Sequence, residues 1–192
     1  MKRVTLQTVL ADREYYLQEM LAGKICIYPT DTLYGLGCRA DSIEAVERIY
    51  DIKKRDNKPV SVIAPSKEWI YMHGDISQKV GEEIDRTLPG PYTYIVSLKH
   101  PEYIAPHVNN GGNTLGIRIP KSRFTELVQE LGIPFVTTSV NISGQPSATS
   151  IDEIDPEILA QVDYVIETDE AMSGVGSTIY DATSDELKVL RK

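Results

Sequence analysis

The sequence predicts an α/β protein in which helices cover a mixed sheet. Predicted strands and helices alternate from one end of the chain to the other, which is typical of a sheet layered with helices. The final two predicted strands are separated only by a short turn, and such a hairpin indicates that some neighbours are antiparallel. The 192 residues suit one large domain and contain no internal repeat or convincing linker. We therefore expect a single domain over residues 1–192.

The N-terminal part predicts a helix, a strand and a loop. An apolar stripe predicts a helix from about Thr8 to Leu21, with Gly23 as its stop. The run Lys24–Tyr28 predicts a strand, and a glycine-rich loop follows it over Thr30–Arg39.

A second helix is predicted after the capping sequence Asp41-Ser42-Ile43-Glu44. Its apolar side carries Ile43, Val46 and Ile49. We expect Asn57-Lys58-Pro59 to end it, because a residue before proline avoids the helical conformation.

The rest of the chain continues the alternation. The predicted strands are Val60–Ala64, Tyr92–Leu98, Thr114–Ile119, Phe135–Ser139, Tyr164–Ile166, Ser177–Tyr180 and Leu187–Leu190. The predicted helices are Ser77–Leu88, Ser122–Leu131 and Pro156–Gln161. Turn-forming residues make loops of Lys99–Asn113 and Asn141–Ser150.

Composition and charge exclude several classes of protein. No apolar run approaches the roughly 20 residues that span a bilayer, and no secretory signal follows Met1. Cys26 and Cys38 form no C-x-x-C pair, so we expect reduced thiols and a cytoplasmic protein without membrane contact. A net charge of −8 argues against bulk binding of nucleic acid.

Two basic clusters stand out from this acidic background. Lys53, Lys54, Arg55 and Lys58 form the first cluster, and Arg118, Lys121 and Arg123 form the second. Such clusters are either solvated faces or local anion sites, and composition alone does not choose between them.

Familiar catalytic and nucleotide-binding motifs are missing. The sequence has no G-x-S-x-G, no G-x-x-x-x-G-K-[ST] and no G-x-G-x-x-G. Its three histidines have no metal-ligand spacing with each other or with the cysteines. We therefore predict no protein-held metal, and any nucleotide must bind without those loops.

Polar side chains follow two predicted strands, where ligands of open α/β sheets usually bind. Thr30 and Thr32 are two residues apart in extended chain and can face the same way. The same holds for Thr137, Ser139 and Asn141. The competing interpretation is that these groups cap turns and helices.

Lys53 and Arg55 form a Lys-x-Arg pair. Residues two apart on a helix do not face the same way, so both can reach one ligand only if the helix ends near Lys54. A lysine and an arginine presented together suit a polyphosphate, and both are predicted near the surface. A basic helix end that complements the helix dipole is the alternative.

The chain resembles the YrdC-like threonylcarbamoyl-AMP synthases over nearly its whole length. Six segments in the family's order carry the resemblance: YPTDTLYGLGCRA (Tyr28–Ala40), RIYDIKKRDNKPVSV (Arg48–Val62), LPGPYTYIV (Leu88–Val96), LGIRIP (Leu115–Pro120), TTSVNISGQPSAT (Thr137–Thr149) and GVGSTIYD (Gly174–Asp181). The resemblance implies a twisted, open, mixed α/β sheet with a deep basic cavity.

The resemblance also implies site residues. Lys53 and Arg55 match the family's Lys-x-Arg and are expected to be catalytic and to bind the nucleotide. The expected nucleotide ligands further include Ser139, Asn141 and Ser147, and the expected threonine ligands are Thr32, Tyr34, Arg118 and Ser177.

The reaction implied by the resemblance is the formation of threonylcarbamoyl-AMP and pyrophosphate from L-threonine, bicarbonate or CO2, and ATP. Nucleotidyl transfer needs alignment and cations more than covalent help, and Mg2+ is expected with the ATP. A partner transferase complex would then modify tRNA, and tRNA itself is a further candidate partner.

Three positions depart from the family pattern and keep alternatives open. Tyr92 follows the YciO-like branch, Gly176 replaces a frequent glutamate, and Val62-Ile63-Ala64 stands where longer members, but not shorter ones, have a histidine in the strand. The alternatives are a non-catalytic module for tRNA or double-stranded RNA, and a module that forms carbamoyl-adenylate.

Overall fold

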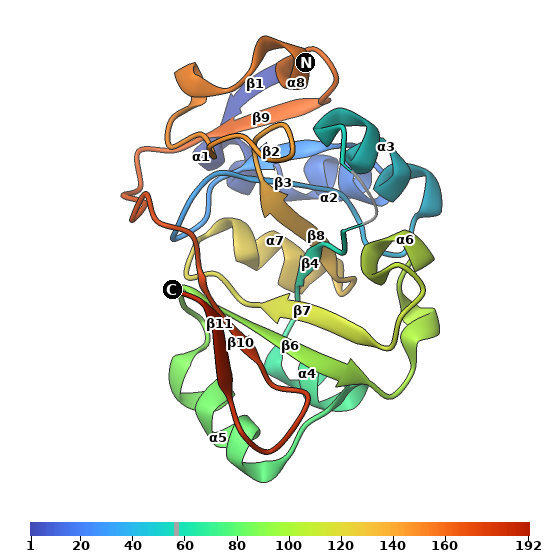
Figure 1. Cartoon of the computed structure of the whole chain (residues 1–192). Helices are drawn as coiled ribbons and strands as arrows, with labels where there is room; N and C mark the ends of the chain where they lie inside the picture. Colours follow the sequence, from blue (N-terminus) through green and yellow to red (C-terminus); the bar gives the residue numbers. More distant parts are fainter. Residues whose placement is uncertain (56–57) are drawn as a thin grey trace.

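The computed structural model describes residues 1–55 and 58–192. Within these ranges eleven strands form one sheet in the order β1-β9-β2-β3-β8-β4-β7-β6-β10-β11, with β5 paired to β6 beside that path (Figure 1). Parallel and antiparallel neighbours are mixed, and the last pair, β10–β11, is an antiparallel hairpin. The predicted twisted, mixed α/β sheet is therefore confirmed.

The strands are short and are distributed over the whole chain. They are β1 Lys2–Thr5, β2 Cys26–Tyr28, β3 Gly35–Gly37, β4 Ser61–Ile63, β5 Gly74–Asp75, β6 Tyr92–Leu98, β7 Thr114–Arg118, β8 Phe135–Ser139, β9 Tyr164–Glu167, β10 Thr178–Asp181 and β11 Lys188–Arg191. The helices are α1 Leu6–Ala11, α2 Arg13–Leu21, α3 Ile43–Lys53, α4 Lys67–His73, α5 Gln78–Thr87, α6 Pro106–Asn109, α7 Phe124–Leu131 and α8 Pro156–Leu159, with 3-10 turns η1 Pro101–Tyr103 and η2 Ile151–Glu153.

The first predicted helix is two helices, because the chain breaks at Asp12 between α1 and α2. Strand β1 precedes them and was not predicted. Its residues are mostly polar and exposed, and its partner β9 lies far along the chain, so no local pattern indicates it. Both departures leave the order of the later elements unchanged.

Strand β3 lies inside the segment predicted as a glycine-rich loop. It pairs with β2 on one side and β8 on the other. A Cβ at Gly37 would lie 1.8 Å from the carbonyl oxygen of Val136, so only glycine allows β8 this close. The glycines that suggested a loop thus permit a tightly packed strand.

Helix α3 begins as predicted, since the Ser42 side chain accepts a hydrogen bond from the Ala45 amide. It ends at Lys53, because Lys54 adopts a left-handed conformation with φ 46°. The helix thus ends earlier than the predicted break at Asn57-Lys58-Pro59, of which Asn57 lies outside the described residues. The helix therefore ends near Lys54, as a ligand shared by Lys53 and Arg55 would require.

Two further segments differ from prediction. The segment Lys99–Asn113 contains η1 and α6, each starting at a proline in its first turn, so it is not merely a loop. Helix α4 and strand β5 were not predicted. The Asn141–Ser150 loop is confirmed.

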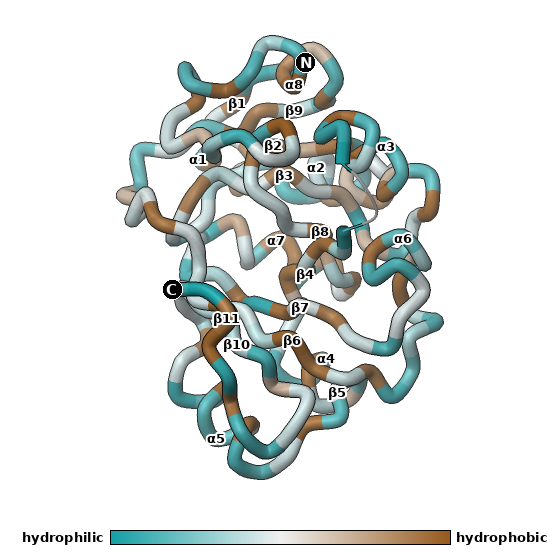
Figure 2. The backbone as a smooth tube through the Cα atoms, viewed as in Figure 1, coloured by the Kyte–Doolittle hydropathy of each residue, from teal (hydrophilic) through white to brown (hydrophobic). Residues whose placement is uncertain are grey.

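Apolar residues on the two faces of the sheet form two buried clusters. Alternate residues of β2 divide between them, with Ile27 in one cluster and Cys26 and Tyr28 in the other. Helices α1, α2 and α7 cover the second cluster, while α3 to α6 and α8 pack on the first (Figures 1 and 2). Every helix in the described ranges lacks the length and apolar character that a membrane crossing requires.

Candidate functional site

A cavity of about 400 Å³ opens beside the central strands. Its wall is rich in hydroxyl groups, from Thr30, Thr32, Ser61, Thr93, Thr137, Thr138, Ser139, Ser147 and Ser177. Four cationic side chains also line it: Arg55, Arg118, Arg191 and Lys192. Among the described lining residues there is no aspartate or glutamate. The cavity is therefore suited to an anion with several hydrogen-bond acceptors.

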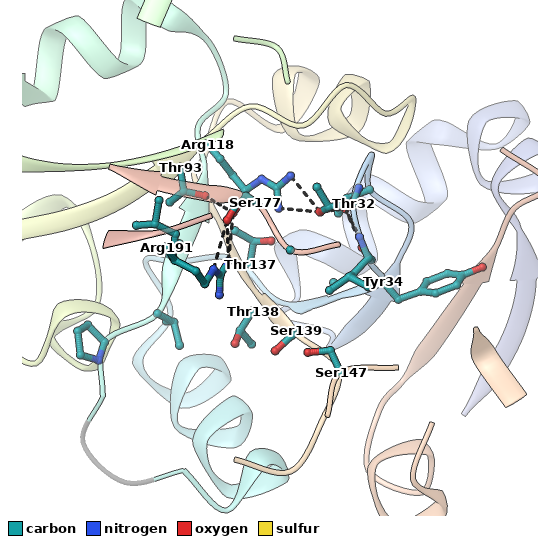
Figure 3. Close-up of a pocket in the computed structure, with 18 of the residues that line it drawn as sticks. Thr32, Tyr34, Thr93, Arg118, Thr137, Thr138, Ser139, Ser147, Ser177 and Arg191 are labelled. Carbon is teal, nitrogen blue, oxygen red and sulfur yellow. Dashed lines mark hydrogen bonds between the residues drawn. The ribbon is translucent and has the colours of Figure 1, made fainter. Parts of the chain in front are cut away.

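The structure brings seven of the nine predicted site residues to this wall. They are Thr32, Tyr34, Arg55, Arg118, Ser139, Ser147 and Ser177. The other two, Lys53 and Asn141, are in contact with the wall without being part of it. Figure 3 shows that the hydroxyls of Thr32, Thr137, Ser177 and Ser139 gather around the same space.

Arg118 is the most enclosed cation of the cavity, with a side chain only 8% exposed. Its Nη2 lies 2.6 Å from Oδ1 of Asp31, and both Nη atoms lie 3.3 Å from the Thr32 hydroxyl. Burial lowers the pKa of Arg118, while Asp31 counteracts that effect. Its Nε is buried and has no hydrogen-bond partner among the described residues.

Asp31 and its neighbours hold Arg118 in place. The second oxygen of Asp31 accepts a hydrogen bond of 3.0 Å from the Lys121 amide. The hydroxyls of Thr30 and Thr32 lie 2.9 Å apart, which confirms that they face the same way. Thr30 also accepts from the Thr32 and Leu33 amides, so it caps a turn as the competing interpretation proposed.

Ser177 lines the same cavity and lies immediately before β10. Its hydroxyl is 2.8 Å from that of Thr93, and Arg191 donates to its carbonyl oxygen at 2.9 Å (Figure 3). Sequence reasoning missed Thr93 and Arg191. Thr93 lies in a segment that carries the family resemblance, but no polar neighbour there indicates a site. Arg191 reaches the cavity only because the β10–β11 hairpin brings it there.

Gly176 creates room for Arg191. A Cβ at this position would lie 3.1 Å from Nη2 of Arg191, closer than ordinary van der Waals contact. Because the frequent glutamate of the family pattern is replaced by glycine, the arginine can lie directly over the backbone. This departure therefore adds to the cationic character of the wall.

Lys53 is almost fully buried, at 1% exposure, so its prediction as a surface residue was wrong. It is the last helical residue of α3, and its Nζ turns inward to the chain that follows β8. There it donates to the carbonyl oxygens of Ser139 and Asn141, and to Oδ1 of Asn141 at 3.1 Å. Burial, and then the charge of Arg55, lower the pKa of Lys53 to about 7.

The Asn141 side chain is engaged at both ends. Its Oδ1 accepts from the Ser139 hydroxyl and from Lys53, and its Nδ2 donates to the carbonyl oxygens of Ile142 and Gln145. These contacts shape the loop that carries Ser147 to the cavity. The structure thus places Asn141 as an organiser of the turn, as the alternative interpretation held.

Arg55 and Tyr34 also line the cavity. Arg55 is half-buried and donates to the carbonyl oxygens of Lys58 and Pro59, at 2.8 Å each. The two members of the Lys-x-Arg pair therefore point to different partners. The Tyr34 ring points away from the hydroxyl cluster (Figure 3), and burial raises the pKa of its phenol.

Tyr92 faces away from the cavity. Side chains alternate along β6, so that Thr93 lines the cavity while Tyr92 and Tyr94 lie on the opposite face. There the rings of Tyr92 and Tyr94 stack on Tyr180, with centroids 6.2 and 5.4 Å away. The feature shared with the YciO-like branch is thus a packing residue in this chain.

The described residues offer no protein cage for a metal, since no group of three or more His, Cys, Asp or Glu side chains is suitably placed. The site instead combines cations and hydroxyls, the groups that bind phosphate and carboxylate oxygens.

Comparison with known proteins agrees with this geometry. A family model described as "Telomere recombination", that of the Sua5, YciO and YrdC proteins, matches residues 18–192. The chain belongs to the Sua5/YciO/YrdC family. A relative from Methanocaldococcus jannaschii, provisionally named threonylcarbamoyl-AMP synthase, is 39% identical over 93% of this chain and 84% of its own length.

Longer members of the Sua5/YciO/YrdC family are also similar. The threonylcarbamoyl-AMP synthase of Pyrococcus abyssi is 32% identical over 88% of this chain, and that of Bacillus subtilis is 30% identical over the same share. This chain covers only 50% and 49% of their lengths, respectively. The names of these relatives support the predicted enzyme class, a nucleotidyltransferase that forms an adenylate.

Solved structures of the family share the fold. The crystal structure of P. abyssi Sua5 complexed with L-threonine superposes with a TM-score of 0.83 at 29% identity, over 92% of this chain and 52% of that one. The solution structure of MTH1692 from Methanobacterium thermoautotrophicum gives 0.74 at 34% identity, over 93% of this chain and 85% of that one. The predicted YrdC-like fold is confirmed.

Proposed function

We propose that this chain is a threonylcarbamoyl-AMP synthase that acts in tRNA modification. The amine of L-threonine forms a carbamate, either by adding to CO2 with loss of a proton or by reacting with bicarbonate with loss of water. One carbamate oxygen then bonds to the α-phosphorus of ATP, while the bond to the leaving pyrophosphate breaks. The relatives' names and the threonine-bound family structure support this activity.

The observation that carries the proposal is the charge of the cavity. Four cationic side chains and nine serine and threonine residues face one space whose described lining has no aspartate or glutamate. Both substrates of the adenylation step, the carbamate of threonine and ATP, are anions, and the transition state places further charge on the leaving pyrophosphate. Fixed cations and hydroxyl donors stabilise that charge without rearranging during the reaction.

The threonine half of the site is proposed to lie around Arg118. Its guanidinium and the neighbouring Thr32 hydroxyl line the cavity and are proposed to bind a carboxylate together with Ser177, which lines the same cavity. Tyr34 lines the cavity, but its ring points away from the hydroxyl cluster, so we propose that its backbone rather than its phenol faces the ligand.

The nucleotide half is proposed to lie between Arg55, Ser139 and Ser147. Lys53 and Asn141 are proposed to act on this half indirectly, because their polar atoms bind each other and the chain around Ser139. We propose that they hold Ser139 and Ser147 in position for the phosphates, while Arg55 and Arg191 supply the charge that touches ATP. Lys53 is thus a positioning residue rather than a direct ligand.

We propose that Mg2+ enters with ATP as part of the substrate. The donor set of the cavity consists of hydroxyls and cations, which fits a metal that is held by phosphates and water rather than by side chains. We further propose that residues 1–192 act as one domain in the cytoplasm, with free Cys26 and Cys38, and deliver the adenylate to a tRNA threonylcarbamoyl transferase complex.

The test is a pyrophosphate-release assay with Mg2+ and ATP. Release should require both L-threonine and bicarbonate, because only their carbamate provides the attacking oxygen. An amino-acid adenylating enzyme would not need bicarbonate, and a carbamoyl-adenylate module would need carbamoyl phosphate and no threonine. Release without threonine, or none from folded protein, would overturn the proposal; the second result would favour the RNA-binding alternative.

A further inference from the structure

Two buried hydroxyls face each other at the cavity wall beside Arg191. Thr93 lies on β6 and is 2% exposed, and Ser177, just before β10, is 5% exposed. Their oxygens are 2.8 Å apart (Figure 3). The two strands pair in parallel, with Thr93 opposite Ile179, so the backbone fixes the separation of the pair.

The chemistry of the ligand decides which hydroxyl donates. Ser177 has a single proton, and Arg191 can only donate to its oxygen, from Nη2 at 3.4 Å. If Ser177 gave its proton to Thr93, none would remain for the cavity. The oxygens of a carboxylate or a carbamate can only accept hydrogen bonds, whereas the N–H of a carbamate can donate one. A hydrogen bond from the Ser177 hydroxyl to such an oxygen therefore requires that Thr93 donate to Ser177.

We propose that Thr93 is a positioning residue that donates its proton to Ser177 and so directs the Ser177 hydroxyl at the threonine-derived anion. This inference rests on the proposed function. Thr93 is suited to the role because its branched side chain has few rotamers and its strand is held firmly. On the other face of β6, the ring of Tyr94 stacks on Tyr180 of β10 at 5.4 Å.

The experiment compares Thr93→Val, Thr93→Ala and Thr93→Ser in the pyrophosphate assay. Valine keeps the shape and removes the hydroxyl, whereas serine keeps the hydroxyl. The matched control is Thr87→Val, because Thr87 and Tyr94 form a hydroxyl pair of the same 2.8 Å length on the opposite face of β6.

We expect Thr93→Val to raise the KM for L-threonine about tenfold, the effect of losing one well-placed hydrogen bond. The KM for ATP and kcat should change less than about twofold, and Thr93→Ser should restore most of the threonine KM. A general loss of structure would not raise the KM for threonine while leaving the KM for ATP nearly unchanged. If the valine variant does not fold, Thr93→Ala supplies the same comparison.

The two proposals fail differently. A wild-type protein without threonine-dependent release overturns the proposed function and this inference with it. An active wild type with an unchanged threonine KM in Thr93→Val and Thr93→Ala overturns the inference alone. It is also overturned if the KM values for both substrates rise together, or if Thr87→Val has the same effect.

Discussion

The ammonium of Lys53 lies 3.1 Å from Oδ1 of Asn141 and 2.8 Å from its backbone carbonyl oxygen. This buried contact joins the end of α3 to the loop after β8. The Lys-x-Arg and Ser-x-Asn motifs, which the sequence suggests as separate ligand-binding segments, are therefore held together by direct contact.

Lys53→Met should destabilise the fold. Methionine matches the length of the side chain but leaves the carbonyl oxygens of Ser139 and Asn141 without their donor. Buried acceptors that lose a partner cost about 1–3 kcal/mol. Urea unfolding would measure this change. Equal stability of variant and wild type would show that the buried contact contributes nothing.

The same pair of proteins should respond differently to pH. The folded-state pKa of Lys53, about 7, lies below the value of 10.5 for an exposed lysine. Between these values the unfolded chain binds more protons than the folded chain, so the folded state gains stability as pH rises. The stability of wild type relative to Lys53→Met should therefore increase from pH 6.5 to 9.5. A constant or falling difference contradicts the assignment.

Arg55→Ala should reduce activity far more than stability. Its side chain is half-buried and lines the cavity, and such substitutions usually change folding by within about 0.5 kcal/mol. A lost charge-assisted contact of about 1.5–3 kcal/mol would lower kcat/KM roughly 10–100-fold. Lys54→Ala is the control, since Lys54 is exposed and pairs with Glu157. Wild-type turnover by Arg55→Ala would show that Arg55 does not bind the substrate.

Asn141→Ala should lower the melting temperature. The variant loses the four hydrogen bonds of the amide, which organise the loop up to Gln145. A loss of about 1–3 kcal/mol corresponds to several degrees for a chain of this size. Calorimetry with ATP distinguishes the roles: weaker binding with an unchanged melting temperature would make Asn141 a direct ligand instead.

Asp31→Asn should destabilise the protein and weaken threonine binding together. Asp31 and Arg118 form a 2.6 Å ion pair whose side chains are 12% and 8% exposed. Leaving one charge of a buried pair unmatched costs about 3–5 kcal/mol. Unfolding and threonine titration would measure the two effects. An unchanged threonine affinity would show that Asp31 does not orient Arg118.

Sequence patterns predicted the interior of the fold better than its edges. Strands such as Tyr92–Leu98 were found because their alternation is set by burial in the sheet itself. Strand β1 was missed because its pairing with β9 joins Lys2 to Tyr164, a contact that no local window contains. Strand β3 was missed because Gly35 and Gly37 are there for close packing, whereas glycine ordinarily marks a loop.

The candidate site was predicted as a set of residues but not as an arrangement. Motifs brought Thr32, Arg118 and Ser177 together correctly. They could not show that Lys53 turns inward, since that depends on the left-handed Lys54 and on where the chain after β8 passes. Nor could they show Arg191, whose position depends on the final hairpin and on the space above Gly176.

The cavity lining extends along the chain from Thr30 to Lys192. A ribosome synthesises these residues in order, so the binding chamber cannot close until the β10–β11 hairpin has emerged and docked beside β6. Contacts between such distant segments form slowly, because a long loop must be ordered first. A protease that cuts the exposed turn between Asp181 and Lys188 would therefore abolish the activity of the enzyme while leaving most of the sheet intact.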